Sequence, residues 1–176
     1  MTTPPVSLAE VREQLNLTAT QIDKDEELWK KLLAATSRLE DEVGHMMPHA
    51  QVDIIRSSPR GNLMLPEWPV LSVEEVRDGN DTVLGGYDVE IKAGRILLSA
   101  CMRAFYTVTY TVGRDPVPEA LWEATLVTAA HLWETQRGPI LAPTLGGGPQ
   151  QRPARGFALP NRARELIVGH LAPVLG

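Results

Sequence analysis

The residues whose types could support metal binding begin with a histidine pair. His45 and His49 stand four residues apart in the segment HMMPH, a spacing that on a helix can present two imidazoles to one metal ion. Gly44 and Pro48 break a helix at this point, and no nearby carboxylate completes the pattern of a zinc protease. We therefore expect a structural or solvent-exposed role for both histidines and no metal site.

The other candidates for chemistry are a single cysteine and a glycine run. Cys101 could act as a nucleophile only with a base held beside it, and it follows a strand-like run between Ala100 and Met102. The segment GGGP at 146–149 lacks the Gly-Lys-Ser/Thr ending of a phosphate-binding loop. The sequence predicts no catalytic residue and no bound cofactor, and this absence fits a structural protein.

Length and composition limit the class of protein further. The 176 residues, with 43% apolar and 22% charged residues, suit one globular domain or one domain with arms. The net charge of −5 argues against a dedicated nucleic-acid binder. One cysteine excludes an internal disulfide framework. Neither a membrane-spanning run nor a signal peptide is expected, which favours a cytoplasmic or assembled intracellular product.

The elements that would position these residues predict an α+β fold. A capping box at Ser7 and Glu10 begins a helix over 7–15. Apolar residues repeating every three or four positions predict two long helices, over 22–43 and 117–137. Between these two helices, about residues 50–112 alternate apolar and polar side chains, which predicts a small inserted antiparallel sheet. Its expected strands are 51–56, 72–77, 87–91, 95–99 and 106–112.

The C-terminal part differs in composition from the rest. Ten of the 28 glycines and prolines fall within residues 138–160, which predicts a linker. Residues 138–176 carry four arginines against one glutamate, whereas the remainder is acidic. The predicted organisation is therefore a core over 1–137, a linker over 138–160 and a docking segment over 161–176, the last forming an extended arm that ends in a short helix near 161–171.

The predicted helix at 117–137 is apolar on nearly every side, with Trp122, Leu126 and Trp133 among its large residues. Such a helix must be covered on nearly every side. One small sheet and one helical hairpin do not suffice, so the pattern favours an oligomer in which neighbouring subunits cover this helix. The three residues are thus candidates for the core or for a subunit interface.

The tail combines basic and apolar side chains. Its helix could dock into a groove of a partner protein, with arginines pairing acidic residues at the rim; the alternative is a frayed, solvated terminus. If the tail docks on a partner, deleting residues 157–176 should leave the core folded. The candidate docking residues are Phe157, Leu159, Arg162, Arg164, Leu166 and Ile167.

Three blocks in order resemble the head–tail connector (adaptor) proteins of long-tailed bacteriophages. They are VSLAEVREQLNL with the helix DKDEELWKKLLAATSRLEDEVGH, then LPEWPVLSVEEVRDGND, then FYTVTYTVGRDPVPEALWEATLVTAAHLWETQRG. The resemblance spans about residues 6–137. It implies a structural protein of the virion neck and not an enzyme. The protein would be made in the host cytoplasm, and its subunits would form a ring, usually of twelve, under the portal.

The resemblance also implies partners. They are the portal protein, the stopper or tail-completion proteins, other copies of the chain, and double-stranded DNA that passes without sequence-specific binding. An acidic body would suit a channel through which DNA slides, because like charges oppose the approach of phosphates. The competing hypothesis is a small cytoplasmic binding module, or a hydrolase-like enzyme using His45, His49 or Cys101, with a flexible tail.

Overall fold

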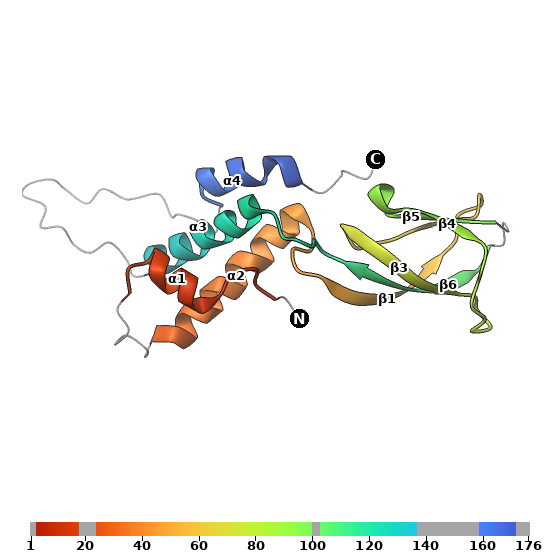
Figure 1. Ribbon diagram of the computed structural model, residues 1–176, viewed down its shortest axis with the longest axis horizontal. Helices are drawn as coiled ribbons and strands as arrows, with labels where there is room; N and C mark the ends of the chain where they lie inside the picture. The colour runs from red at the N-terminus through yellow and green to blue at the C-terminus, as the bar shows by residue number, and fades with distance from the viewer. Residues whose placement is uncertain (1–2, 18–23, 100–102, 137–158, 172–176) are drawn as a thin grey trace, which may run out of the picture. The chain divides into compact units, whose positions relative to one another are not determined.

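The computed structural model of the chain describes residues 3–17, 24–99, 103–136 and 159–171. These residues fall into two compact units. The first unit is helical and combines residues of Met1–Asp41 with residues of Pro118–His170. The second unit is formed mainly by Glu42–Val117 and contains the strands (Figure 1). Helices together with small antiparallel sheets confirm the predicted α+β class.

The first two helices begin and end close to their predicted bounds. The capping box precedes α1 (Leu8–Gln14), where the Ser7 hydroxyl accepts from the Glu10 backbone N–H at 3.3 Å. Arg12 then pairs with Asp25 at 2.8 Å, which ties α1 to the first turn of α2 (Asp25–Val43). The buried face of α2 is the predicted one, formed by Leu28, Leu32, Ala35, Leu39 and Val43.

The third helix, α3 (Glu119–Gln136), is buried along most of its length. Residues of α2 and α3 share one apolar cluster, against which Leu8 and Leu15 from the α1 region also pack. The short helix α4 (Asn161–Ile167), continued by a 3₁₀ turn over Val168–His170, lies along another side of α3 (Figure 1). Helices of the same chain therefore cover much of α3, so the apolar sides of this helix do not by themselves require neighbouring subunits.

The strands form two three-stranded antiparallel sheets, where the sequence predicted one. The first sheet has the order β1 (His49–Arg56), β6 (Phe105–Val112), β3 (Val70–Arg77). The second has the order β2 (Asn62–Met64), β5 (Arg95–Leu98), β4 (Tyr87–Glu90). The sequence analysis missed β2, because three residues between turns carry no alternating pattern.

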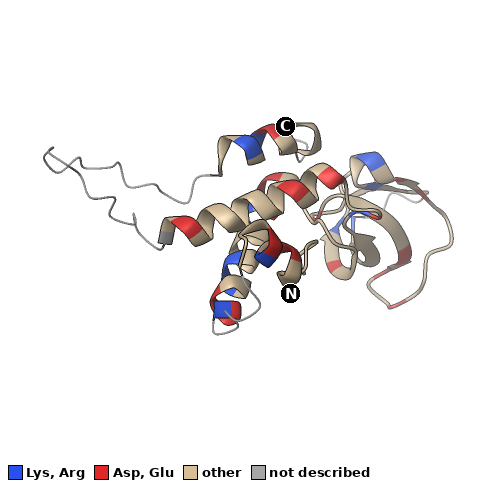
Figure 2. Ribbon diagram, turned by 60° about the vertical axis from the view of Figure 1, so that its left-hand side comes forward, with Lys and Arg blue, Asp and Glu red and all other residues tan. Residues whose placement is uncertain are grey.

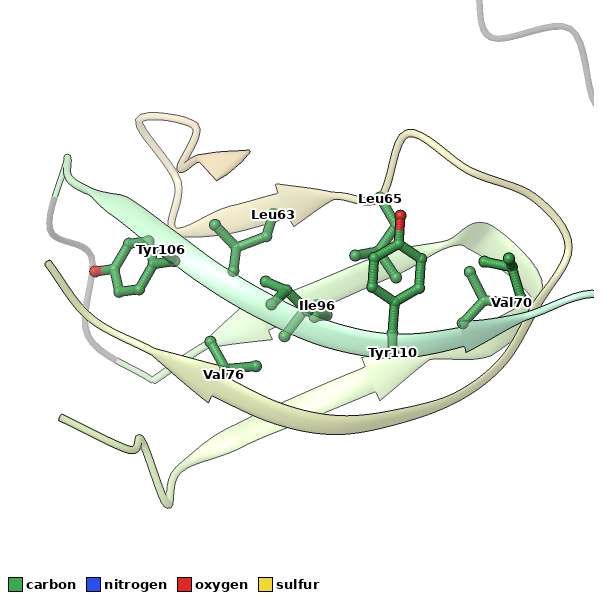
Figure 3. Packing of buried hydrophobic residues seen from close by; sticks show 9 residues of the cluster. Leu63, Leu65, Val70, Val76, Ile96, Tyr106 and Tyr110 are labelled. Carbon is green, nitrogen blue, oxygen red and sulfur yellow. The ribbon is translucent and has the colours of Figure 1, made fainter. Parts of the chain in front are cut away.

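One apolar cluster joins the two sheets (Figure 3). The central strand β6 buries alternate residues, Tyr106 to Val112, as its pattern predicts. Leu63 of β2 and Ile96 of β5 meet them from the second sheet. Of the helices in the described ranges, none is long and apolar enough to cross a membrane.

Candidate functional site

The helix α4 carries most of the predicted docking residues, and α3 lies directly beneath it. Leu159, Ala163 and Ile167 stand four residues apart and are buried, so they form the single face that packs on α3. Two of the predicted docking residues, Leu159 and Ile167, are thus occupied within the chain. Phe157 lies outside the described residues.

The outer side of α4 is basic and partly apolar. Arg162 pairs with Glu123 of α3, and Arg164 is exposed to solvent. Figure 2 shows the basic residues of α4 beside the acidic residues of α3. Leu166 is half-buried, and Val168 in the following turn is 66% exposed. This outer side can bind an acidic or apolar partner while the inner side stays on α3.

A hollow of about 320 Å³ opens beside the start of α4. Its walls come from Ala34 and Ser37 of α2, from Thr128, His131 and Leu132 of α3, and from Leu159. Arg38 and Asp41, which pair at 3.4 Å, also line it. Although Ser37, Thr128 and His131 are polar, most of the exposed lining is apolar, so the hollow suits an apolar side chain of a polypeptide rather than a charged ligand.

The predicted core or interface residues of α3 separate into two groups. Trp133 and Leu126 are buried in the helical cluster. Trp122 is only half-buried and lines a second, open hollow of about 520 Å³ with Glu10 and Glu13. Hydrogen bonds from the Ser7 backbone and hydroxyl hold the pKa of Glu10 below its usual value. Of the three, Trp122 alone keeps surface for contact with another molecule.

The two histidines come together at the end of α2, with a carboxylate that the sequence analysis did not connect to them. The Nε2 of His45 lies 2.8 Å from an oxygen of Glu67, and the His45 and His49 rings meet edge to face with centroids 4.5 Å apart. Among the described residues, no group of three possible ligands could hold a metal ion. The His45 backbone also donates to the Trp68 carbonyl at 2.8 Å, so we interpret the cluster as structural.

Arg114 stabilises the same turn and was missed by the sequence analysis. Its guanidinium donates to the carbonyl oxygens of Val43 at 2.7 Å and of His45 at 2.8 Å, and it lies 5.0 Å from the centroid of the Trp68 ring. Burial lowers the pKa of Arg114. A cation at this position satisfies carbonyls that the end of a helix leaves without partners. Nothing in a single arginine after a strand indicates such a role.

A second polar contact, partly buried, lies in the sheet unit. The Tyr110 hydroxyl donates to Asp53 at 2.5 Å, joining β6 to β1. Burial, followed by the Asp53 carboxylate, raises the pKa of Tyr110 above its ordinary value. Because Asp53 and Tyr110 are 57 residues apart, no local pattern could have predicted this pair.

Comparison with known families identifies the chain. The model of the family described as head completion protein matches residues 6–170, so the chain belongs to this family. No curated protein matches the chain. The family is one of structural bacteriophage proteins with a role in head assembly and a place in the virion. The resemblance to phage head–tail connectors is thereby confirmed at the level of the family.

Proposed function

We propose that this protein is a head-to-tail adaptor, a structural protein without enzymatic activity that forms a ring under the portal and joins the capsid to the tail. The observation that carries the proposal is the family match across residues 6–170. A protein that completes a head acts where the packaged head meets the tail, at the virion neck. A ring there, of twelve subunits, would extend the DNA channel and receive the stopper or tail-completion proteins.

The C-terminal helix supplies the contact with the portal in this proposal. Since Leu159 and Ile167 hold α4 on α3, the contact uses the outer side of the helix, with Arg162, Arg164 and Leu166. The positive charge of this tail, on a chain with a net charge of −5, favours an acidic surface on the portal. Phe157, just before α4, remains a candidate for the same contact.

Neighbouring subunits meet through surfaces other than the buried part of α3. Trp122 beside the open hollow between α1 and α3 is the best-placed aromatic residue for such a contact, since half-buried tryptophans are frequent anchors of interfaces. The acidic residues of the body suit a channel wall to which passing DNA does not adhere.

Electron microscopy of the purified protein mixed with its portal tests the function. Two-dimensional classes should show an additional ring on one end of the portal. The charge-reversal variant Arg164→Glu should weaken binding at least tenfold, while Lys92→Glu, with the same charge change on an exposed residue of the sheet unit, should bind normally. Absence of a ring at saturating protein would refute the adaptor function, and equal binding by the two variants would refute the role of α4.

A further inference from the structure

The strand β1 lies at one edge of its sheet and has a regular backbone. Among the described strands it pairs with β6 alone, and the eight residue pairs from His49↔Val112 to Arg56↔Phe105 run without a shift. The opposite side of β1 therefore offers a row of backbone N–H and C=O groups to another strand. Proteins usually protect such an edge with lysine, proline, a bulge or an inward-pointing charge. The segment HAQVDIIR has no lysine, proline or bulge, and its inward-pointing charge, Asp53, accepts a hydrogen bond from Tyr110 of the same chain.

Apolar side chains on the outer face of the sheet make this edge more favourable for pairing. Val52 is 58% exposed and Ile54 is 73% exposed, and Phe105 on the neighbouring strand is 59% exposed. In the register with β6, Val52 lies opposite Thr109 and Ile54 opposite Thr107. The outer face next to the edge is thus apolar or β-branched, with Arg56 at one end.

The other edge of the same sheet is unsuited to pairing. Strand β3 shifts register twice against β6, between Val70 and Ser72 and between Val73 and Glu75. Bulges of this kind bend an edge strand and end its pairing. In addition, a bridge between Arg77 and Val83 covers one end of β3. The β1 edge of one copy therefore cannot pair with the β3 edge of another copy. Association through β1 should thus stop at a dimer.

We propose that β1 pairs antiparallel with β1 of a second copy, with the two-fold axis at Val52. Residues directly opposite each other in an antiparallel pair point to the same side of the sheet. Outer residues of one copy must therefore lie opposite outer residues of the other copy in the pairing. Two registers meet this condition with seven residues overlapping, one centred on Val52 and the other on Asp53. Centring on Asp53 places two carboxylates opposite each other, which is unfavourable.

The register centred on Val52 places no two like charges opposite each other. Ala50 lies opposite Ile54 on the outer face, and Gln51 lies opposite Asp53 on the inner face, where an amide can donate to the carboxylate. The pair is a state of the free protein and does not rest on the proposed function. Neighbouring subunits of a cyclic ring contact each other through two different surfaces, whereas the β1 pair uses the same surface of both copies. The β1 dimer and the ring are therefore two different modes of association.

Cysteine cross-linking of the full-length protein tests the register. In a Cys101→Ser background, Val52→Cys should give a disulfide-linked dimer under mild oxidation, because the two Cβ atoms across the axis would be about 5 Å apart. Ile54→Cys is the matched control. Its two copies would lie about 13 Å apart along the strands, beyond the reach of a disulfide, so it should stay monomeric on a non-reducing gel.

Analytical ultracentrifugation tests the association itself. The wild-type chain should sediment as a concentration-dependent dimer, and Val52→Arg should weaken the dimer at least tenfold without changing the circular dichroism spectrum, since Val52 is largely exposed. A wild-type chain that stays monomeric at all concentrations would overturn the proposal. Equal cross-linking of the Val52→Cys and Ile54→Cys variants would overturn the register, as would a Val52→Arg variant that folds and still dimerises.

Discussion

The contact between α4 and α3 leads to a quantitative prediction for Ile167→Ala. Ile167 is 3% exposed and shares its buried face with Leu159 and Ala163. Truncating a buried isoleucine to alanine costs about 2–5 kcal/mol when the residue stays in a packed core. A smaller loss is expected here, because α4 has only seven residues and a helix of this length is not stable without its contact.

The free energy with which α4 binds α3 sets the upper limit of the effect. Burial of two large aliphatic side chains contributes about 3–6 kcal/mol, and the conformational entropy lost in ordering the helix offsets part of this. Once a substitution removes the whole net free energy of docking, α4 separates from α3, and any additional loss of contacts in α4 no longer changes the stability of the rest of the protein. We therefore expect Ile167→Ala to lower the free energy of α4 docking by about 1–3 kcal/mol.

Native-state hydrogen exchange measures this quantity directly. The backbone amides of α4 should exchange faster in Ile167→Ala by a factor of about 5 to 150, which corresponds to the same free energy. Val168→Ala, one residue further on at a position 66% exposed, is the matched control and should change exchange by less than a factor of three. Equal protection in Ile167→Ala and Val168→Ala would refute the packing of α4 on α3.

Three further substitutions test other parts of the structure. Trp133→Ala, at a position 2% exposed, should cost the helical unit about 3–5 kcal/mol; an unchanged denaturation midpoint would contradict its burial. Arg114→Ala removes the donors to Val43 and His45 and should cost about 1.5–3 kcal/mol, measured by urea unfolding; Lys92→Ala should cost almost nothing. Because the fold raises the pKa of Tyr110, the wild type should lose stability as pH rises above about 10. Tyr110→Phe should lose less between pH 8 and 11, and identical slopes would exclude this contribution.

Local patterns predicted elements such as α2 and β6 because each of them buries one face. The residues from Leu28 to Val43 that repeat along α2 are buried, and so are the alternate residues of β6 from Tyr106 to Val112. The pairing of the strands could not be predicted in the same way. Strand β6 lies between β1 and β3 although it is the last strand in the chain, and the alternation within a strand does not show which other strand it pairs with.

The sequence shows which residues the C-terminal helix carries but not how that helix is arranged in the fold. The apolar circumference of α3 showed that something must cover it, whereas only the structure shows that α4 does so. The contacts of Arg114 with Val43 and of Tyr110 with Asp53 join residues 71 and 57 positions apart. No periodic signal connects residues at such separations, so these pairs require the folded chain.

Burial of α4 also changes what a deletion of residues 157–176 would report. The sequence alone predicts that the core folds without this segment and loses only its binding to the portal. With Leu159, Ala163 and Ile167 packed on α3, the deletion should also expose apolar surface of α3, giving faster exchange of α3 amides and self-association at high concentration. Loss of portal binding by the deletion would then have two causes. Arg164→Glu distinguishes loss of the docking side chains from exposure of α3, because it alters the outer side of α4 and leaves the buried face intact.

The deletion also tests the burial itself. If the deleted chain exchanges its α3 amides as slowly as the full chain, α4 does not cover α3.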